Sequence, residues 1–105
     1  MKTTTKYGGE AVAVYAIDLC HYGDRGDYEV FPDRELALDV RARSADLAGA
    51  GFEIDYATEE VSIFRDGRGT EFTMYADGRL IVEGLRPGSP RQAFDVAAAI
   101  LGYGI

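Results

Sequence analysis

Residues 70–102 read TEFTMYADGRLIVEGLRPGSPRQAFDVAAAILG, which is the pattern of a hairpin followed by a helix. Apolar and polar side chains alternate on both sides of the central Asp-Gly, as they do in half-buried strands. A loop of residues 76–78 places Phe72 opposite Val82, whereas a loop of residues 77–78 alone would bury Glu83 beside Phe72. The hydrophobic pattern therefore selects the longer loop.

The second half of this stretch predicts a helix from Pro90 to Leu101. Ser89 can accept a hydrogen bond from an amide of the first turn, and proline suits the first helical position. Gly102 suits the end of the helix. The apolar residues recur with the helical period and form one face, which we expect to pack on a sheet: Ala93, Phe94, Ala97, Ile100 and Leu101.

Upstream residues predict a second helix and further strands. Asp33 can cap a helix over residues 34–48, and although residues 36–42 also alternate like a strand, the alanines and the glycines that follow favour the helix. Residues 10–18 predict a covered strand, residues 19–27 a loop rich in Gly and Asp, and residues 28–31 a short extended piece. Residues 52–56 and 61–64 predict two half-buried strands.

These elements predict a two-layer α+β sandwich in a single domain of residues 1–105, with residues 1–9 as a flexible segment. The expected order is strand, helix, four-stranded antiparallel meander and helix. Turns over residues 57–60 and at Asp66-Gly67 would bring one set of side chains to the inner face, under the helices: Phe52, Ile54, Tyr56, Val61, Ile63, Phe72, Met74, Leu80 and Val82. The other face of the sheet would then be open.

With this order of elements the chain resembles one repeat of the TATA-box-binding protein core, in which a long strand, a helix, a curved meander and a closing helix follow in turn. The local similarity lies in residues 75–84, YADGRLIVEG, and in the helix ending at Leu101-Gly102. This stretch also looks like the C-terminal tail of the adenylyltransferases that activate sulfur carrier proteins. The resemblance implies the half-domain fold and no activity. The chain carries carboxylates where the saddle would meet DNA, and it lacks the nucleotide-binding and zinc-binding parts of those enzymes.

Composition and charge argue against several classes of function. The formal net charge is −7, from 18 acidic against 11 basic residues, and the basic residues are scattered along the chain. This disfavours direct binding of nucleic acid, and the acidity suits either a solubilising surface or a basic partner. There is neither a signal peptide nor a run of roughly 18 apolar residues, so we expect a cytoplasmic protein without membrane association.

Candidate catalytic groups are few. Cys20 adjoins His21, and a thiol beside an imidazole is a known nucleophile, but no third group orients the pair. Cys20, His21 and Asp24 lack the four-ligand spacing of a structural zinc site, so we expect no metal and no cofactor. Residues 66–69 lack the Lys and Ser or Thr of a phosphate-binding loop and are expected to form a turn.

The first functional hypothesis is a non-enzymatic module that binds a protein partner, or a second copy of the chain, through the open sheet face. Three apolar anchors and four carboxylates would form this surface: Phe64, Tyr75 and Ile81, rimmed by Glu53, Asp55, Glu71 and Glu83. One alternative is an acidic inhibitor that mimics nucleic acid and occupies a basic protein, which calls for carboxylates in a line at phosphate-like spacing. Another is a small thiol enzyme, which requires a cleft around Cys20.

Overall fold

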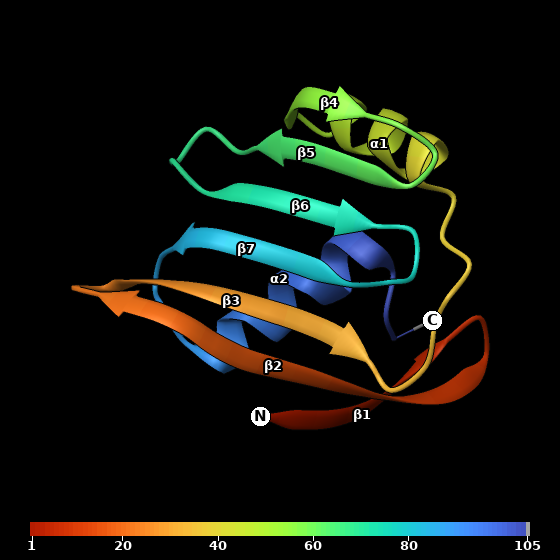
Figure 1. Ribbon diagram of the computed structural model, residues 1–105, viewed down its shortest axis with the longest axis horizontal. Coiled ribbons are helices and arrows are strands. Elements are labelled where there is room, and N and C mark those ends of the chain that lie inside the picture. The colour runs from red at the N-terminus through yellow and green to blue at the C-terminus, as the bar shows by residue number, and fades with distance from the viewer. Residues whose placement is uncertain (105) are drawn as a thin grey trace.

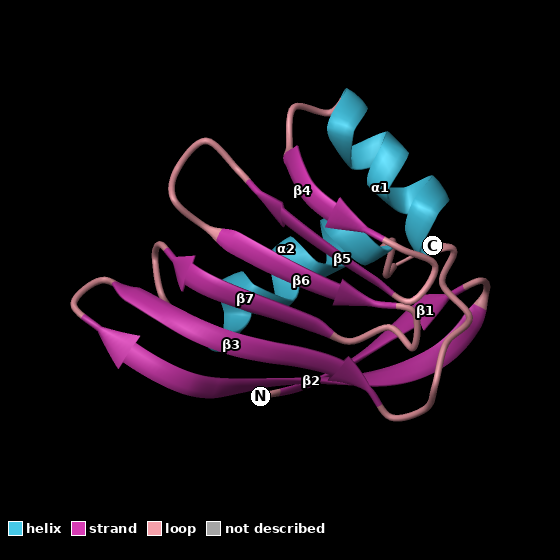
Figure 2. Cartoon of the chain, turned by 45° about the horizontal axis from the view of Figure 1, so that its top comes forward, coloured by secondary structure: helices cyan, strands magenta, loops and turns pink. Residues whose placement is uncertain are grey.

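The structure is a computed structural model that describes residues 1–104, and it has two layers (Figure 1). One layer is a seven-stranded antiparallel sheet of order β1-β2-β3-β7-β6-β5-β4. The other layer is a pair of helices that lie on the same face of that sheet (Figure 2). The elements run, in chain order, β1 (Lys2–Tyr7), β2 (Glu10–Tyr22), β3 (Arg25–Pro32), α1 (Val40–Gly49), β4 (Glu53–Ala57), β5 (Val61–Arg65), β6 (Glu71–Tyr75), β7 (Leu80–Leu85) and α2 (Pro90–Leu101). The predicted two-layer α+β fold is confirmed.

The hairpin and the closing helix agree with the sequence pattern in detail. Phe72 pairs with Val82, and Gly78 takes the left-handed conformation (φ 98°) that the longer loop requires. Helix α2 begins at Pro90, where the Ser89 side chain accepts from the Gln92 amide at 3.1 Å. It ends at Gly102 with φ 87°, and its predicted apolar face is buried. These features depend on local interactions that neighbouring residues supply by themselves.

The N-terminal third contains more strands than predicted. Residues 2–7, expected within a flexible segment, form β1 and pair along their whole length with β2. Gly8 and Gly9 both have positive φ (59° and 85°), which is the conformation of a tight two-residue hairpin turn. The segment 19–27, expected to be a loop, belongs to β2 and β3 except for its turn. A bulge between Asp18 and Cys20 interrupts the alternation there and conceals the strand in the sequence.

Helix α1 begins six residues later than its predicted start, at Val40 instead of Arg34. The cap is Asp39, whose side chain accepts from the Ala42 amide at 3.1 Å, and not Asp33. The preceding linker is held in extended form because the Leu36 and Leu38 amides donate to the carbonyl oxygens of the β6–β7 turn. This tertiary pairing competes with helix formation in the linker.

Strand β5 presents the opposite face from the one predicted. Ser62 and Phe64 point into the core, and Val61 and Ile63 lie on the other face. The expected two-residue turn at Asp66-Gly67 is instead a loop of residues 66–70. In this loop the Asp66 carboxylate accepts from the Arg68 and Thr70 amides at 2.8 and 3.1 Å. A second bulge, between Ile54 and Tyr56, turns Tyr56 away from the core as well.

The core lies between the sheet and the helices. Phe64 and Phe72 stack with their ring centroids 5.1 Å apart, and Phe52 meets both rings edge-on. Helix α1 packs on β4 and β5, whereas α2 packs on β2, β3 and β7. Within residues 1–104, neither helix combines the length and the apolar character needed to cross a membrane.

Candidate functional site

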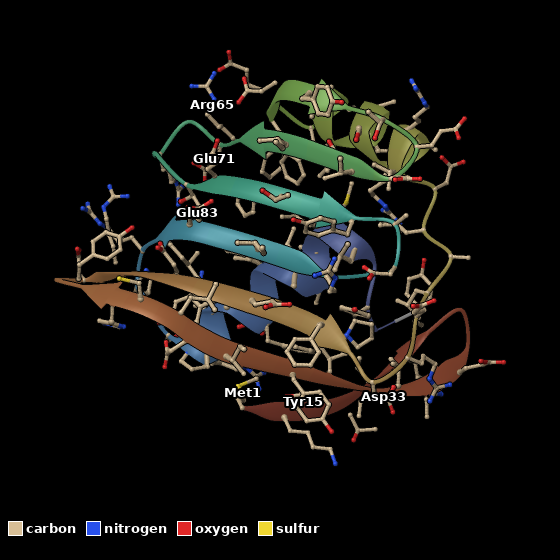
Figure 3. All side chains as sticks on the ribbon, viewed as in Figure 1. Met1, Tyr15, Asp33, Arg65, Glu71 and Glu83 are labelled. Atoms are coloured by element: carbon tan, nitrogen blue, oxygen red, sulfur yellow. The ribbon has the colours of Figure 1, made fainter. Side chains whose placement is uncertain are left out.

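The candidate site is the open face, the side of the sheet that faces away from α1 and α2 and that Figure 3 shows toward the viewer. Because the seven strands pair side by side, the side chains of this face form rows that run across the strands between the bulges. No helix or loop of residues 1–104 packs over these rows (Figures 1 and 2). The face is therefore uncovered within the described residues.

A central row of mostly apolar side chains crosses six strands. Its ends are well exposed, with Ile17 at 41% and Tyr56 at 55%. Ile63 and Ile81, in the middle, are half-buried by their neighbours on the same face. The row comprises, from β2 to β4, Ile17, Glu29, Ile81, Thr73, Ile63 and Tyr56. This is the apolar centre of the face.

Aromatic side chains flank one side of the central row. Tyr15 and Phe31, which pair across β2 and β3, stack with centroids 5.4 Å apart. Tyr75 lies under the guanidinium of Arg79, whose central carbon is 4.2 Å from the ring centroid. Arg79 also contacts Asp77 at 3.0 Å, so this cation is already partnered.

A charged row flanks the other side and consists of Glu53, Arg65, Glu71 and Glu83, each directly opposite the next. Figure 3 shows the last three one below another at the left of the sheet. The Arg65 guanidinium binds Asp55 through two hydrogen bonds of 2.8 and 2.9 Å and lies 3.0 Å from Glu53. These carboxylates, Asp55 foremost, raise the pKa of Arg65, so the side chain stays cationic.

Glu71 and Glu83 face each other without a cation between them. Neither takes part in any of the ion pairs formed by residues 1–104. Like charges directly opposite in a sheet are destabilising, by roughly 0.2–1 kcal/mol on the scale of cross-strand pairs. Arg65, opposite Glu71 on its other side, attracts that carboxylate, whereas Glu83 faces no cation of the row.

Most of the residues proposed from the sequence do lie on this face. Five of them lie directly on the face: Tyr75, Ile81, Glu53, Glu71 and Glu83. Asp55 lies in the bulge of β4 and contacts the face through its ion pair with Arg65. Phe64 is a correction: it is 0% exposed and belongs to the core, because the longer β5–β6 loop shifts the register.

Sequence reasoning missed most of the apolar surface. Ile17, Tyr15 and Phe31 belong to strands of the N-terminal third, of which only part was predicted, and Ile63 and Tyr56 were assigned to the core. Alternation within residues 10–18 was the available signal, but apolar residues on both faces of that strand concealed which side was open.

The thiol and imidazole of the chain do not form a catalytic pair. Consecutive residues of a strand point to opposite faces, and Cys20 pairs with Asp27 while His21 pairs with Gly26. The His21 Nδ1 atom lies 3.4 Å from the hydroxyl of Tyr28. Cys20 is exposed, and no group of His, Cys, Asp and Glu side chains in residues 1–104 is arranged to hold a metal ion.

Similarity to characterised proteins gives no further guide to this surface. Comparisons with protein-family models, with curated proteins and with solved structures found no significant match for the chain. The resemblance to a TATA-binding repeat accordingly stays a prediction.

Proposed function

We propose that the chain is a non-enzymatic binding module whose open face receives a basic protein. The partner would cover the central row with an apolar surface and place a Lys or Arg side chain between Glu71 and Glu83. The single observation that carries this proposal is that these two carboxylates lie opposite each other and that neither forms an ion pair within residues 1–104.

The central row supplies the apolar contacts that such a complex needs. Ile17 and Tyr56 are exposed enough to enter a partner's surface, while Ile63 and Ile81 lie between them. Apolar and aromatic side chains at the centre of an interface carry most of its binding energy, and the polar rim excludes water. The sheet fixes these side chains before the partner arrives, which lowers the entropic cost of association.

Charge favours a basic partner over a second copy of the chain. Arg65 and Arg79 are each bound by neighbouring carboxylates, and Lys2 lies over the ring of Tyr15 at the edge of the face. A second copy would therefore bring more acidic than basic groups to the contact, and like charges across an interface oppose association. A basic protein offers the complementary potential.

The test is to neutralise the unpartnered pair with Glu71→Gln and Glu83→Gln in one chain. The matched control is Asp46→Asn with Asp95→Asn, which removes two exposed carboxylates of α1 and α2, on the other side of the sheet. We expect the first variant to keep or slightly raise the melting temperature, because a like-charge contact disappears. The parent, the control and the first variant are each used to capture proteins from native extract. A protein that binds the parent and the control but not the first variant is then purified for titration.

With such a purified partner, we expect the affinity to fall at least about tenfold in the first variant and to weaken with added salt in the parent. Equal affinity of the parent, control and variant would contradict the proposal. A concentration-dependent dimer in sedimentation that Ile63→Ser dissolves would assign the face to a second copy instead.

A further inference from the structure

A cleft of ≈ 550 Å³ lies on the other side of the sheet, in the helix layer. It arises because α1 and α2 cover different strands and β6 passes between them. At one end of this gap the linker residues Leu36 and Leu38 are fixed to the β6–β7 turn. At the other end, beside the loop of residues 66–70, the gap stays open.

The cleft has an apolar interior and a polar mouth. Aromatic and aliphatic side chains from the sheet, from α2 and from the start of β4 line the interior: Phe52, Phe72, Leu85, Val96, Ala99 and Ile100. The polar lining comprises Asp66, Arg68, Thr70, Arg86 and Gln92. Its volume lies within the roughly 300–1,000 Å³ typical of small-molecule sites, which share this combination of an apolar body and a few polar groups.

The mouth carries two cations, Arg68 and Arg86, and within residues 1–104 they differ in their ion pairs. Arg86 binds Asp24 at 3.0 Å. The Oδ1 atom of Asp66 accepts from two backbone amides of its own loop. Arg68 forms no ion pair within residues 1–104, although the chain as a whole has an excess of acids.

We infer that this cleft binds a small amphipathic monocarboxylate, with its apolar body between α2 and the sheet and its carboxylate on the Arg68 guanidinium. Guanidinium and carboxylate match in charge and in planar geometry, and a charge-assisted hydrogen bond is stronger than a neutral one. One free cation beside the bound carboxylates of Asp24 and Asp66 suits a singly charged head better than a dianion. The inference does not depend on the proposed function, because the cleft and the open face lie on opposite sides of the sheet.

The probe is decanoate, with decanol as its uncharged counterpart and decyl phosphate as its dianionic one. Each is titrated into the whole chain below its micellar concentration, and binding is followed by calorimetry and by amide chemical shifts. We expect decanoate to bind most tightly of the three, with the largest shifts at the cleft residues from β6, β7 and α2. Shifts confined to the open face, or decyl phosphate binding more tightly than decanoate, would overturn the assignment.

Two variants separate the charge from the cavity. Arg68→Gln should weaken decanoate roughly tenfold and leave decanol unchanged, since only the charged head loses its partner. Ala99→Phe places a ring in the cleft from an exposed helical position and should abolish binding of both probes.

The controls Arg41→Gln and Ala45→Phe make the same changes at exposed positions of α1 away from the cleft, and they should bind like the parent. Circular dichroism of every variant verifies the fold. Decanoate affinity that is insensitive to both Arg68→Gln and Ala99→Phe would refute the inference.

Discussion

At the scale of the residue, Phe64 shows how a single side chain reports the register of a strand. It is fully buried and stacks on Phe72, whereas its neighbour Ile63 lies half-buried on the open face. Both are large apolar residues of β5. Because their surroundings differ, truncating each side chain to alanine should lower the free energy of unfolding by very different amounts.

We therefore expect Phe64→Ala to lower the free energy of unfolding by about 3–5 kcal/mol, the cost of deleting a buried aromatic ring. Ile63→Ala serves as the control and should cost about 1 kcal/mol or less, because a half-buried side chain leaves no closed cavity. Chemical denaturation monitored by circular dichroism measures both. Similar losses in the two variants would mean that β5 has the inverted face that its alternation suggested.

At the scale of the element, the hydrogen bond that caps helix α1 shows where the helix begins. Asp39→Ala removes the acceptor of the first-turn amide and should destabilise the chain by about 1 kcal/mol. Asp33→Ala, at the start predicted from the sequence, should change stability by about 0.5 kcal/mol or less, since its carboxylate only contacts the exposed Arg34. A larger loss at Asp33 would place the helix start in the linker.

The elements that could be predicted from the sequence are those whose signals are local. Ser89, Pro90 and Gly102 mark the ends of α2 through contacts within a few residues, and the β6–β7 hairpin follows from alternation around Gly78. The errors lie where distant atoms decide. The linker is extended because it pairs with the β6–β7 turn, and two bulges break the period of β2 and β4.

The difference between local and long-range signals also explains which residues of the open face could be predicted from the sequence. Tyr75, Ile81, Glu71 and Glu83 were found because β6 and β7 alternate without interruption. Phe64 was misplaced because the Asp66 carboxylate, through hydrogen bonds to backbone amides, builds a longer loop than the Asp-Gly signal predicts. Rows that join strands from both halves of the chain depend on the pairing of β3 with β7, which no local pattern specifies.

At the scale of the whole molecule, two buried tyrosines link stability to alkaline pH. Burial, and next the carboxylate of Asp18, raise the pKa of Tyr28 from 10.0 to about 12, and burial raises the pKa of Tyr103 further still. Unfolded tyrosine loses its proton near its usual pKa, while the folded protein retains it. The unfolded state thus binds fewer protons in this range, and stability falls as the pH rises from about 10 towards 12.

The measurement is the melting temperature across that interval, with tyrosinate absorbance recorded in parallel. Tyr28→Phe removes one of the two buried tyrosine hydroxyls and should flatten the decline of the melting temperature with rising pH. Tyr103→Phe should have the same effect. Tyr56→Phe, at an exposed position, is the control and should leave the slope unchanged. An identical slope in all variants would contradict the role of the buried hydroxyls.

The two outermost strands of the sheet limit how this chain can aggregate. β1 carries Lys2 and Lys6 on either side of three threonines, and the Gly104 amide donates to the Lys6 carbonyl oxygen at 2.7 Å, whereas β4 is short and broken by its bulge. Lysines, short strands and bulges are the features that prevent the edge of one sheet from extending onto the next. Growth into fibrils would have to start from these edges, so we expect concentrated solutions to remain free of cross-β fibres.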